Sequence, residues 1–469
     1  MNTDTSIKKN FAYKSILTLS SYLMNFVTFP YVSRVLGVER IGLVNFVDNT
    51  VSYFLLFATL GINILGVREI ATVKSNLDER NQVFSNLLGM NLCFSLITLV
   101  VYLVCVMAIP QLRQYEELFY IGTSKIIFTV FLVEWFFTGI EHFRYITLRS
   151  IAIKNLYVVA VFVCIRSRDD YELYFIMTMA VVVINALVNM AYVRRFVSVK
   201  CQELLSERFY KKNLMLGVYS IMTSMYLTFN VMFLGFVSNN VEVGYYTTAF
   251  KLYSVILGFF SAFTNVMLPR MSALLSNGEK ESFQRLANKS FYTMCIFCIP
   301  MIVCSIILAP QLVYVLSGEG YEGAVLPMRI IMPAALFVGM AQVLAVQILT
   351  PMKCDKIMLA ASIIGDAVRL LLNLLLVPHI HSVGTAVVLL CSEIVVTVTY
   401  IVYVVHYKVV RIPFNSIWKG IGVSLPCALI CLMSFSFIEN QFASLLVASF
   451  ASGSFLFVAI KYIVRFEKL

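Results

Sequence analysis

Eight charged residues lie inside long apolar runs of this sequence, where an unpaired charge is costly. They are four basic and four acidic residues: Lys125, Lys251, Arg329, Arg369, Asp48, Glu134, Asp366 and Glu393. A charged side chain at the centre of a lipid bilayer costs about 2.5–3.5 kcal/mol on insertion scales. We therefore expect these side chains to pair with one another or to line a hydrated cavity, where the basic ones could bind an anionic ligand.

Depth along the predicted helices distinguishes Asp48, Lys125, Lys251 and Arg329. At 1.5 Å per residue, Asp48, Lys125 and Lys251 lie roughly 10–12 Å from the outer ends of their apolar runs. Arg329 is shallower, so its long side chain could reach the membrane surface. Lys125 and Lys251 have no acidic residue three or four positions away. Two interpretations therefore remain: the charges line a cationic cavity for an anionic substrate, or they form structural ion pairs.

The other four residues suggest more local roles. Asp366 and Arg369 are three residues apart on one helical face and could simply pair with each other. Glu393 is predicted near the middle of its helix, and Glu134 close to the inner membrane surface. By an internal repeat described below, Asp48 and Lys251 hold nearly equivalent places in opposite halves, so we expect both to point into a shared cavity.

The amino-acid composition is strongly apolar over the whole chain. Of 469 residues, 60% are hydrophobic and only 13% are charged, whereas about a quarter of a soluble protein is charged. The sequence therefore predicts an all-α polytopic membrane protein. The 11 cysteines lie mostly in apolar runs, and Cys295-x-x-Cys298 falls within one of them. We expect no disulfide framework, metal site or cofactor.

Apolar runs of nearly spanning length predict about 14 transmembrane helices. Most of the 36 Lys and Arg residues lie between these runs on one side, which the positive-inside rule assigns to the cytoplasm together with both termini. The net charge of +11 is thereby explained without a nucleic-acid partner. The predicted runs are 13–33, 41–65, 84–109, 117–139, 150–165, 173–193, 213–236, 245–268, 290–309, 324–350, 358–378, 383–405, 413–437 and 442–464.

A weak internal repeat predicts two similar halves. Lys8-Lys9-Asn10 recurs as Lys211-Lys212-Asn213, and Ser75-Asn76 recurs as Ser276-Asn277. An offset of six helices relates two parallel halves about the membrane normal. We expect two six-helix lobes around a central cavity, residues 1–193 and 213–405, joined by a cytoplasmic linker at 194–212. Residues 406–469 would add two further helices.

Two stretches resemble one family of membrane proteins. Glu134–Asn155 reads EWFFTGIEHFRYITLRSIAIKN, and Phe29–Gly37 reads FPYVSRVLG. Both stretches, with Arg68-Glu69-Ile70-Ala71 and Asp169-Asp170-Tyr171, are similar to the Wzx-type flippases of O-antigen and capsular polysaccharide. The resemblance covers about residues 10–180. The family belongs to the superfamily of multidrug, oligosaccharidyl-lipid and polysaccharide exporters.

The resemblance implies a function that agrees with the charges. It implies a flippase that moves undecaprenyl-pyrophosphate-linked oligosaccharide from the inner to the outer leaflet of the bacterial inner membrane by alternating access. The lipid bilayer would be its environment, and a polysaccharide polymerase and chain-length machinery its partners. In similar lipid II flippases, the two extra C-terminal helices contact the lipid tail. An ion-coupled multidrug exporter is the main alternative, and a membrane polymerase or ligase is another, although the longest outer loop, about 310–323, is short for an enzyme.

Overall fold

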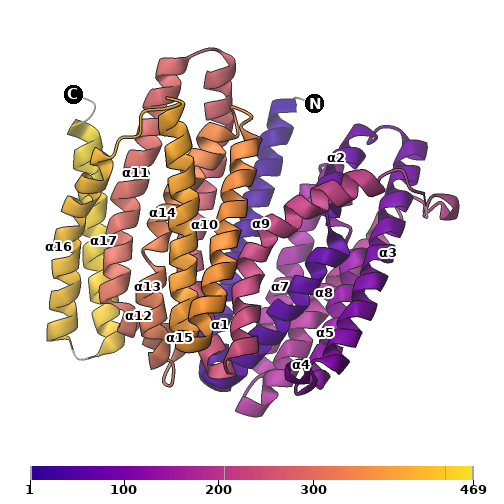
Figure 1. Ribbon diagram of the computed structural model, residues 1–469, viewed down its shortest axis with the longest axis horizontal. Coiled ribbons are helices and arrows are strands. Elements are labelled where there is room, and N and C mark those ends of the chain that lie inside the picture. The colour runs from indigo at the N-terminus through magenta and orange to yellow at the C-terminus, as the bar shows by residue number, and fades with distance from the viewer. Residues whose placement is uncertain (1–2, 205, 439, 467–469) are drawn as a thin grey trace. The chain divides into compact units, whose positions relative to one another are not determined.

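The computed structural model describes residues 3–204, 206–438 and 440–466, and every regular element within these ranges is helical. Figure 1 traces the chain, which divides into two compact units, Met1–Phe236 and Val237–Leu469. The prediction of an all-α protein is confirmed. The finer division into lobes at 193 and 213 stays a prediction.

Unit 1 contains nine α-helices, among the residues described, and its first helix is interrupted. Gly37, at φ 75° and ψ 170°, breaks α1 where two predicted runs meet. Only a residue without a Cβ adopts these angles easily. The helices are α1 (Thr3–Thr59), α2 (Ile62–Thr72), α3 (Leu77–Ala108), α4 (Pro110–Arg113), α5 (Glu116–Thr129), α6 (Glu134–Gly139), α7 (Phe143–Cys164), α8 (Tyr171–Val193) and α9 (Tyr210–Val237).

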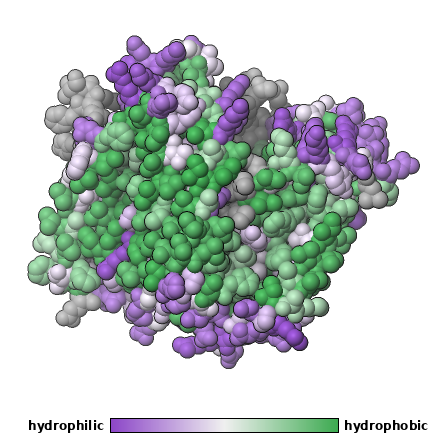
Figure 2. All heavy atoms as spheres, in the orientation of Figure 1, coloured by the Kyte–Doolittle hydropathy of each residue, from purple (hydrophilic) through white to green (hydrophobic). Residues whose placement is uncertain are grey.

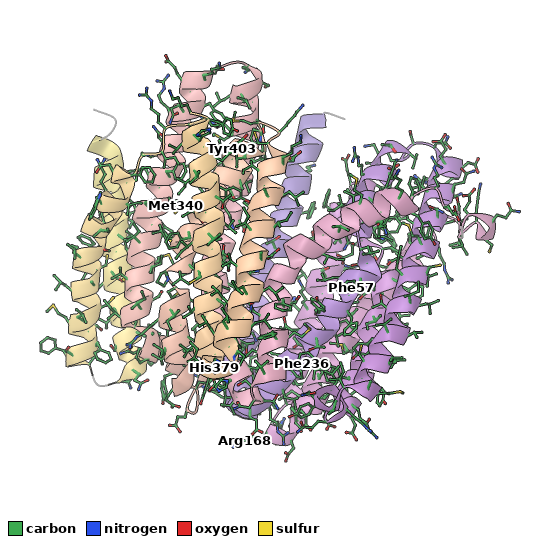
Figure 3. The ribbon with its side chains drawn as sticks, in the orientation of Figure 1. Phe57, Arg168, Phe236, Met340, His379 and Tyr403 are labelled. Carbon is green, nitrogen blue, oxygen red and sulfur yellow. The ribbon has the colours of Figure 1, made fainter. Side chains whose placement is uncertain are left out.

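Unit 2 contains a long helical hairpin within α15. The backbone φ and ψ angles of Ile380 and His381 are not helical, so α15 consists of two helices. In Figure 3, His379 marks the bend of this hairpin and Tyr403 lies near the opposite, open end. The elements are α10 (Asn240–Ser276), α11 (Lys280–Ile307), α12 (Ala309–Ser317), α13 (Val325–Ile331), α14 (Ala334–Gln342), the π-helix η5 (Val343–Leu349), α15 (Asp355–His406), α16 (Asn415–Phe437) and α17 (Gln441–Phe466).

The helices have the length and surface of membrane-spanning segments. Within the described residues, ten helical segments are long and apolar enough to cross a bilayer. Figure 2 shows hydrophobic residues along the sides of the helices and hydrophilic residues gathered near their ends. A polytopic membrane protein is therefore confirmed, because such surfaces are stable only in lipid. The number of 14 crossings stays a prediction, since α1 and α15 each merge two of the predicted runs.

Two predicted boundaries are wrong. The predicted outer loop at 310–323 is largely the helix α12, which buries Val313 and Leu316 against its neighbours. The fifth predicted run began at residue 150, but α7 begins at Phe143. Polar residues at the start of α7 lower the hydropathy of its first turns, so the predicted run began too late. The structure shows that such residues pair with groups on neighbouring helices.

The aromatic stretch Glu134–Gly139 forms part of the core of unit 1. Trp135, Phe136 and Phe137 are buried and pack against α2, α3 and α8. Gly66 of α2 lies directly beneath the indole, since a Cβ there would come within 2.5 Å of the Trp135 ring. The short helix α6 is therefore fixed in position by packing, which also positions Glu134 at its first residue.

The polar segment between α8 and α9 docks on α3. Asn81 and Ser85 accept hydrogen bonds from the backbone N–H groups of Ser198 (2.9 Å) and Lys200 (2.8 Å). The Asn86 amide donates to the Glu203 carbonyl at 3.1 Å. Three side chains one helical turn or less apart on α3 thus hold the backbone of the predicted linker in a fixed path.

Candidate functional site

The predicted charges of α1 and α5 form an ion pair. Lys125 Nζ lies 2.5 Å from Asp48 Oδ1 and 2.9 Å from Ser52 Oγ. Both charged side chains remain partly accessible, at 17% for Lys125 and 34% for Asp48. The structure thus gives Asp48 a partner within unit 1, 77 residues away in the sequence. The predicted relation of Asp48 to Lys251 stays a prediction.

Two predicted basic residues of unit 2, Lys251 and Arg329, lie on α10 and α13. Lys251 is partly exposed on α10 and interacts with other groups of the protein. Arg329 is exposed near the end of α13, and its Nε donates to the Ile306 carbonyl at 3.1 Å. The shallow position predicted for Arg329 agrees with this contact at the end of α11.

Three predicted residues of α15 come together in a buried cluster. Arg369 lies 3.4 Å from Asp366 Oδ1 and 3.9 Å from Glu393 Oε1, and donates to Ser392 Oγ at 2.9 Å. Arg369 and Glu393 are 3% and 5% exposed. The Asp366–Arg369 pairing suggested by their spacing is confirmed. Because Arg369 and Glu393 lie on the two arms of α15, the cluster joins the arms of the hairpin.

Unit 1 contains a second charged cluster, centred on Arg149. Arg149 lies 2.6 Å from Glu134 Oε1 and donates to Ser150 Oγ at 3.0 Å and to the Asn189 side-chain oxygen. Glu134 is the counter-ion of a guanidinium only 4% exposed. Its predicted position close to the inner membrane surface stays a prediction. The cluster therefore ties α6, α7 and α8 together.

The cluster also supports a break in a spanning helix. After the 3-10 helix Val130–Leu132, Val133 adopts φ 37° and ψ 34°, which is unfavourable for a β-branched residue. The break frees the Leu132 carbonyl, which accepts a hydrogen bond from the amide of the fully buried Asn189. A discontinuous helix of this kind is common where transporters bind substrates or ions.

The predicted site residues do not include Lys154, a further cation within a candidate membrane span. Arg149 precedes the predicted run 150–165 and Lys154 falls inside it, and both lie within α7. Lys154 donates to Ser21 Oγ of α1 at 2.5 Å. Helical periodicity could have revealed Lys154, since Leu148, Leu156 and Val159 form an apolar face on the opposite side of the helix.

His142 lies in the turn before α7, within an aromatic group. Its ring is 5.5 Å from that of Phe196 and 5.9 Å from those of Tyr145 and Tyr192. Burial lowers the pKa of His142 below its usual value near 6.5. The turn therefore carries a mainly neutral imidazole at neutral pH.

The described residues hold no group of three or more His, Cys, Asp or Glu that could bind a metal ion. Cys295 and Cys298 are buried within α11. What the structure does offer is charge inside membrane-spanning helices: ion pairs that join different helices in unit 1, and a cluster around the buried Arg369 and Glu393 in unit 2. Charge of this kind is typical of membrane transporters.

The chain belongs to the family described as "Polysaccharide biosynthesis protein", whose sequence profile matches residues 7–275. It is 24% identical over 428 residues to a protein of Escherichia coli (strain K12) named "Putative O-antigen transporter", covering 87% of this chain and 99% of that one. A protein of the same name from Shigella dysenteriae is 23% identical over 404 residues, covering 83% of this chain and 98% of that one.

Solved structures of transporters have the same fold. The lipid II flippase MurJ, in an inward closed conformation, matches with a TM-score of 0.77 at 14% identity, over 96% of this chain and 99% of that one. An inward-facing multidrug resistance transporter of the MATE family matches with a TM-score of 0.62 at 15% identity, over 84% and 98%. At these identities the likeness establishes the fold alone.

Proposed function

We propose that this protein is a flippase that moves undecaprenyl-pyrophosphate-linked oligosaccharide from the inner to the outer leaflet of the membrane. The observation that carries the proposal is the excess of basic side chains among the charged contacts described above for α1, α5, α6 and α7, in unit 1 of a polysaccharide biosynthesis protein. There, Lys125, Arg149 and Lys154 outnumber Asp48 and Glu134. Relatives named as O-antigen transporters support the same substrate class.

The chemistry of this substrate explains why the protein needs charged helices. A pyrophosphate carrying several sugars cannot enter hydrocarbon unaided, because its charges and hydroxyl groups would lose their hydration. Ammonium and guanidinium groups bind phosphate oxygens through short, charge-assisted hydrogen bonds. Lys251, Lys125 and Arg329, which keep some exposure, are proposed to contact the substrate, with Asp48 as an exchangeable counter-ion.

The membrane orientation follows from the same proposal. With both termini in the cytoplasm of a bacterium, the basic loops face the side on which lipid-linked sugars are assembled. A single cysteine introduced at position 318 on a cysteine-free background should then react from outside, and one at 202 only after permeabilisation. A polymerase acting on the outer leaflet would consume the product.

Genetic complementation tests the function. Deleting the gene should remove the surface polysaccharide and accumulate lipid-linked repeat units, and the wild-type gene should restore export. Normal surface polysaccharide after deletion, with an altered resistance to cationic drugs, would instead support the multidrug exporter that the MATE-like fold permits.

The C-terminal helices are proposed to contact the lipid tail. A cavity of about 230 Å³ lies between α11, α12, α16 and α17, lined mostly by apolar side chains such as Leu308, Leu445 and Leu456. Filling it with Ser449→Phe should slow export several-fold if the tail enters it. Val447→Phe, at an exposed position of the same helix, is the matched control. Equal export by both variants would exclude a tail site there.

A further inference from the structure

Lys154 lies near the middle of a spanning helix, on the side away from lipid. It is eleven residues from the start of α7 and ten from its end, so it lies roughly 15–17 Å from either end at 1.5 Å per residue. At 100° per residue, it shares a face with the buried Ser150 and Val161. The opposite face carries the exposed side chains Leu148, Leu156, Val159 and Val163.

The hydrogen-bonding capacity of Lys154 is incompletely used within the described residues. Its ammonium group has three donors, and the structure gives it one acceptor, Ser21 Oγ at 2.5 Å. Ser21 itself donates to the Leu17 carbonyl at 2.8 Å. Two ammonium hydrogens thus remain for another acceptor, and the side chain is only partly buried.

The neighbouring carboxylate does not provide this acceptor. Glu134 and Arg149 are close enough to Lys154 to interact with it electrostatically. However, the contact at 2.6 Å joins Glu134 to Arg149, and Arg149 is held in place by Ser150 and Asn189. Together the three residues carry a net charge of +1 beside α7, which an anion would neutralise.

We propose that Lys154 and Ser21 form an anion site between α1 and α7 that binds the phosphate groups of the transported lipid. The inference rests on the proposed function, whose substrate carries two phosphates, and adds the residues that hold them in unit 1. Lys154 donates directly to phosphate oxygens, while Arg149, neutralised by Glu134, contributes to the positive potential without leaving its partners. A tetrahedral phosphate offers several oxygens to one ammonium group.

Binding to the purified full-length protein in lipid nanodiscs tests the site. The probe is undecaprenyl pyrophosphate, and undecaprenol is the phosphate-free control. Lys154→Gln removes a charged hydrogen bond and should weaken binding of the pyrophosphate roughly 10- to 100-fold, without changing the binding of undecaprenol. Lys154→Arg should recover most of the affinity. Lys74→Gln, which removes the same charge from an exposed turn, should bind like the wild type.

A purely structural role for Lys154 predicts a different pattern. A lysine that only joins α1 to α7 would leave the affinity of every folded variant unchanged and lower only the thermal stability. That result would overturn the proposal. Ser21→Ala, which keeps the charge, gives an independent measurement if Lys154→Gln does not fold, and unchanged affinity in Ser21→Ala would then count against the site. If Lys154→Gln binds and exports normally, the site is wrong and the flippase function stands; if the wild type fails to restore export, the function itself is wrong.

Discussion

The two units place their intramembrane charges in different environments. In unit 1, the carboxylates of Asp48 and Glu134 are 34% and 48% exposed, and their ion pairs join different helices. In unit 2, Arg369 and Glu393 are 3% and 5% exposed and belong to a single hairpin. Accessible charges can exchange partners with a ligand, whereas buried ones mainly hold structure. We infer that the accessible basic residues contact the substrate and that the buried Arg369 and Glu393 mainly stabilise unit 2.

The largest effect should come from the buried cluster. Arg369→Leu leaves Glu393 in a buried site without its cation, and breaking a buried pair costs about 3–5 kcal/mol. We expect little protein in the membrane. Arg369→Leu combined with Glu393→Leu should recover much of the protein level, because no orphan charge remains. Thermal unfolding in detergent measures both. Normal stability in the single variant would contradict a structural role.

The next effect concerns the broken helix of unit 1. Asn189→Leu leaves the Leu132 carbonyl and Arg149 each short of a partner, at a cost of about 1–3 kcal/mol. Asn185→Leu, one turn earlier on α8, is the control, since Asn185 only donates to the Val181 carbonyl of its own helix. A similar loss of stability in both variants would show that the break does not depend on Asn189.

The third prediction concerns the Asp48–Lys125 ion pair between α1 and α5, which should affect export more than stability. Because both side chains are partly exposed, we expect Lys125→Gln to reduce stability by about 1 kcal/mol or less, yet to reduce export several-fold. Export is measured as surface polysaccharide at matched protein levels. If Lys125 contacts the substrate, adding Asp48→Asn should not restore export. Restoration in the double variant would reassign the pair to structure.

The smallest expected effect is on the pH dependence of folding stability, through His142 in the turn before α7. Burial lowers the pKa of His142, so the unfolded chain binds more protons than the folded one as the pH falls below about 6.5. This contribution favours the folded state at neutral pH and is lost on acidification. We expect a slightly smaller fall in melting temperature between pH 7.5 and 5.5 for His142→Phe than for the wild type. Identical falls would show that His142 is freely hydrated.

Much of the fold could be predicted from sequence because bilayer thickness sets helix length. Nearby pairing could also be anticipated, as Asp366 and Arg369 show. The partner of Lys125 could not, because Asp48 is 77 residues away and only tertiary packing brings them together. Arg149 and Lys154 were not predicted as site residues, because basic residues at the start of an apolar run resemble the flank of a membrane span. The helix break at Val133 carries no Gly or Pro to reveal it.

The most direct test of the account is flipping in proteoliposomes. Purified protein is reconstituted with fluorescent undecaprenyl-pyrophosphate-linked oligosaccharide, and a membrane-impermeant reagent reports how much has reached the opposite leaflet. The account predicts rapid movement of the lipid with the wild type. The rate should be at least about tenfold lower with Lys154→Gln and nearly that of the wild type with Lys74→Gln. No movement above protein-free liposomes with the folded wild type, under any ion gradient, would contradict it.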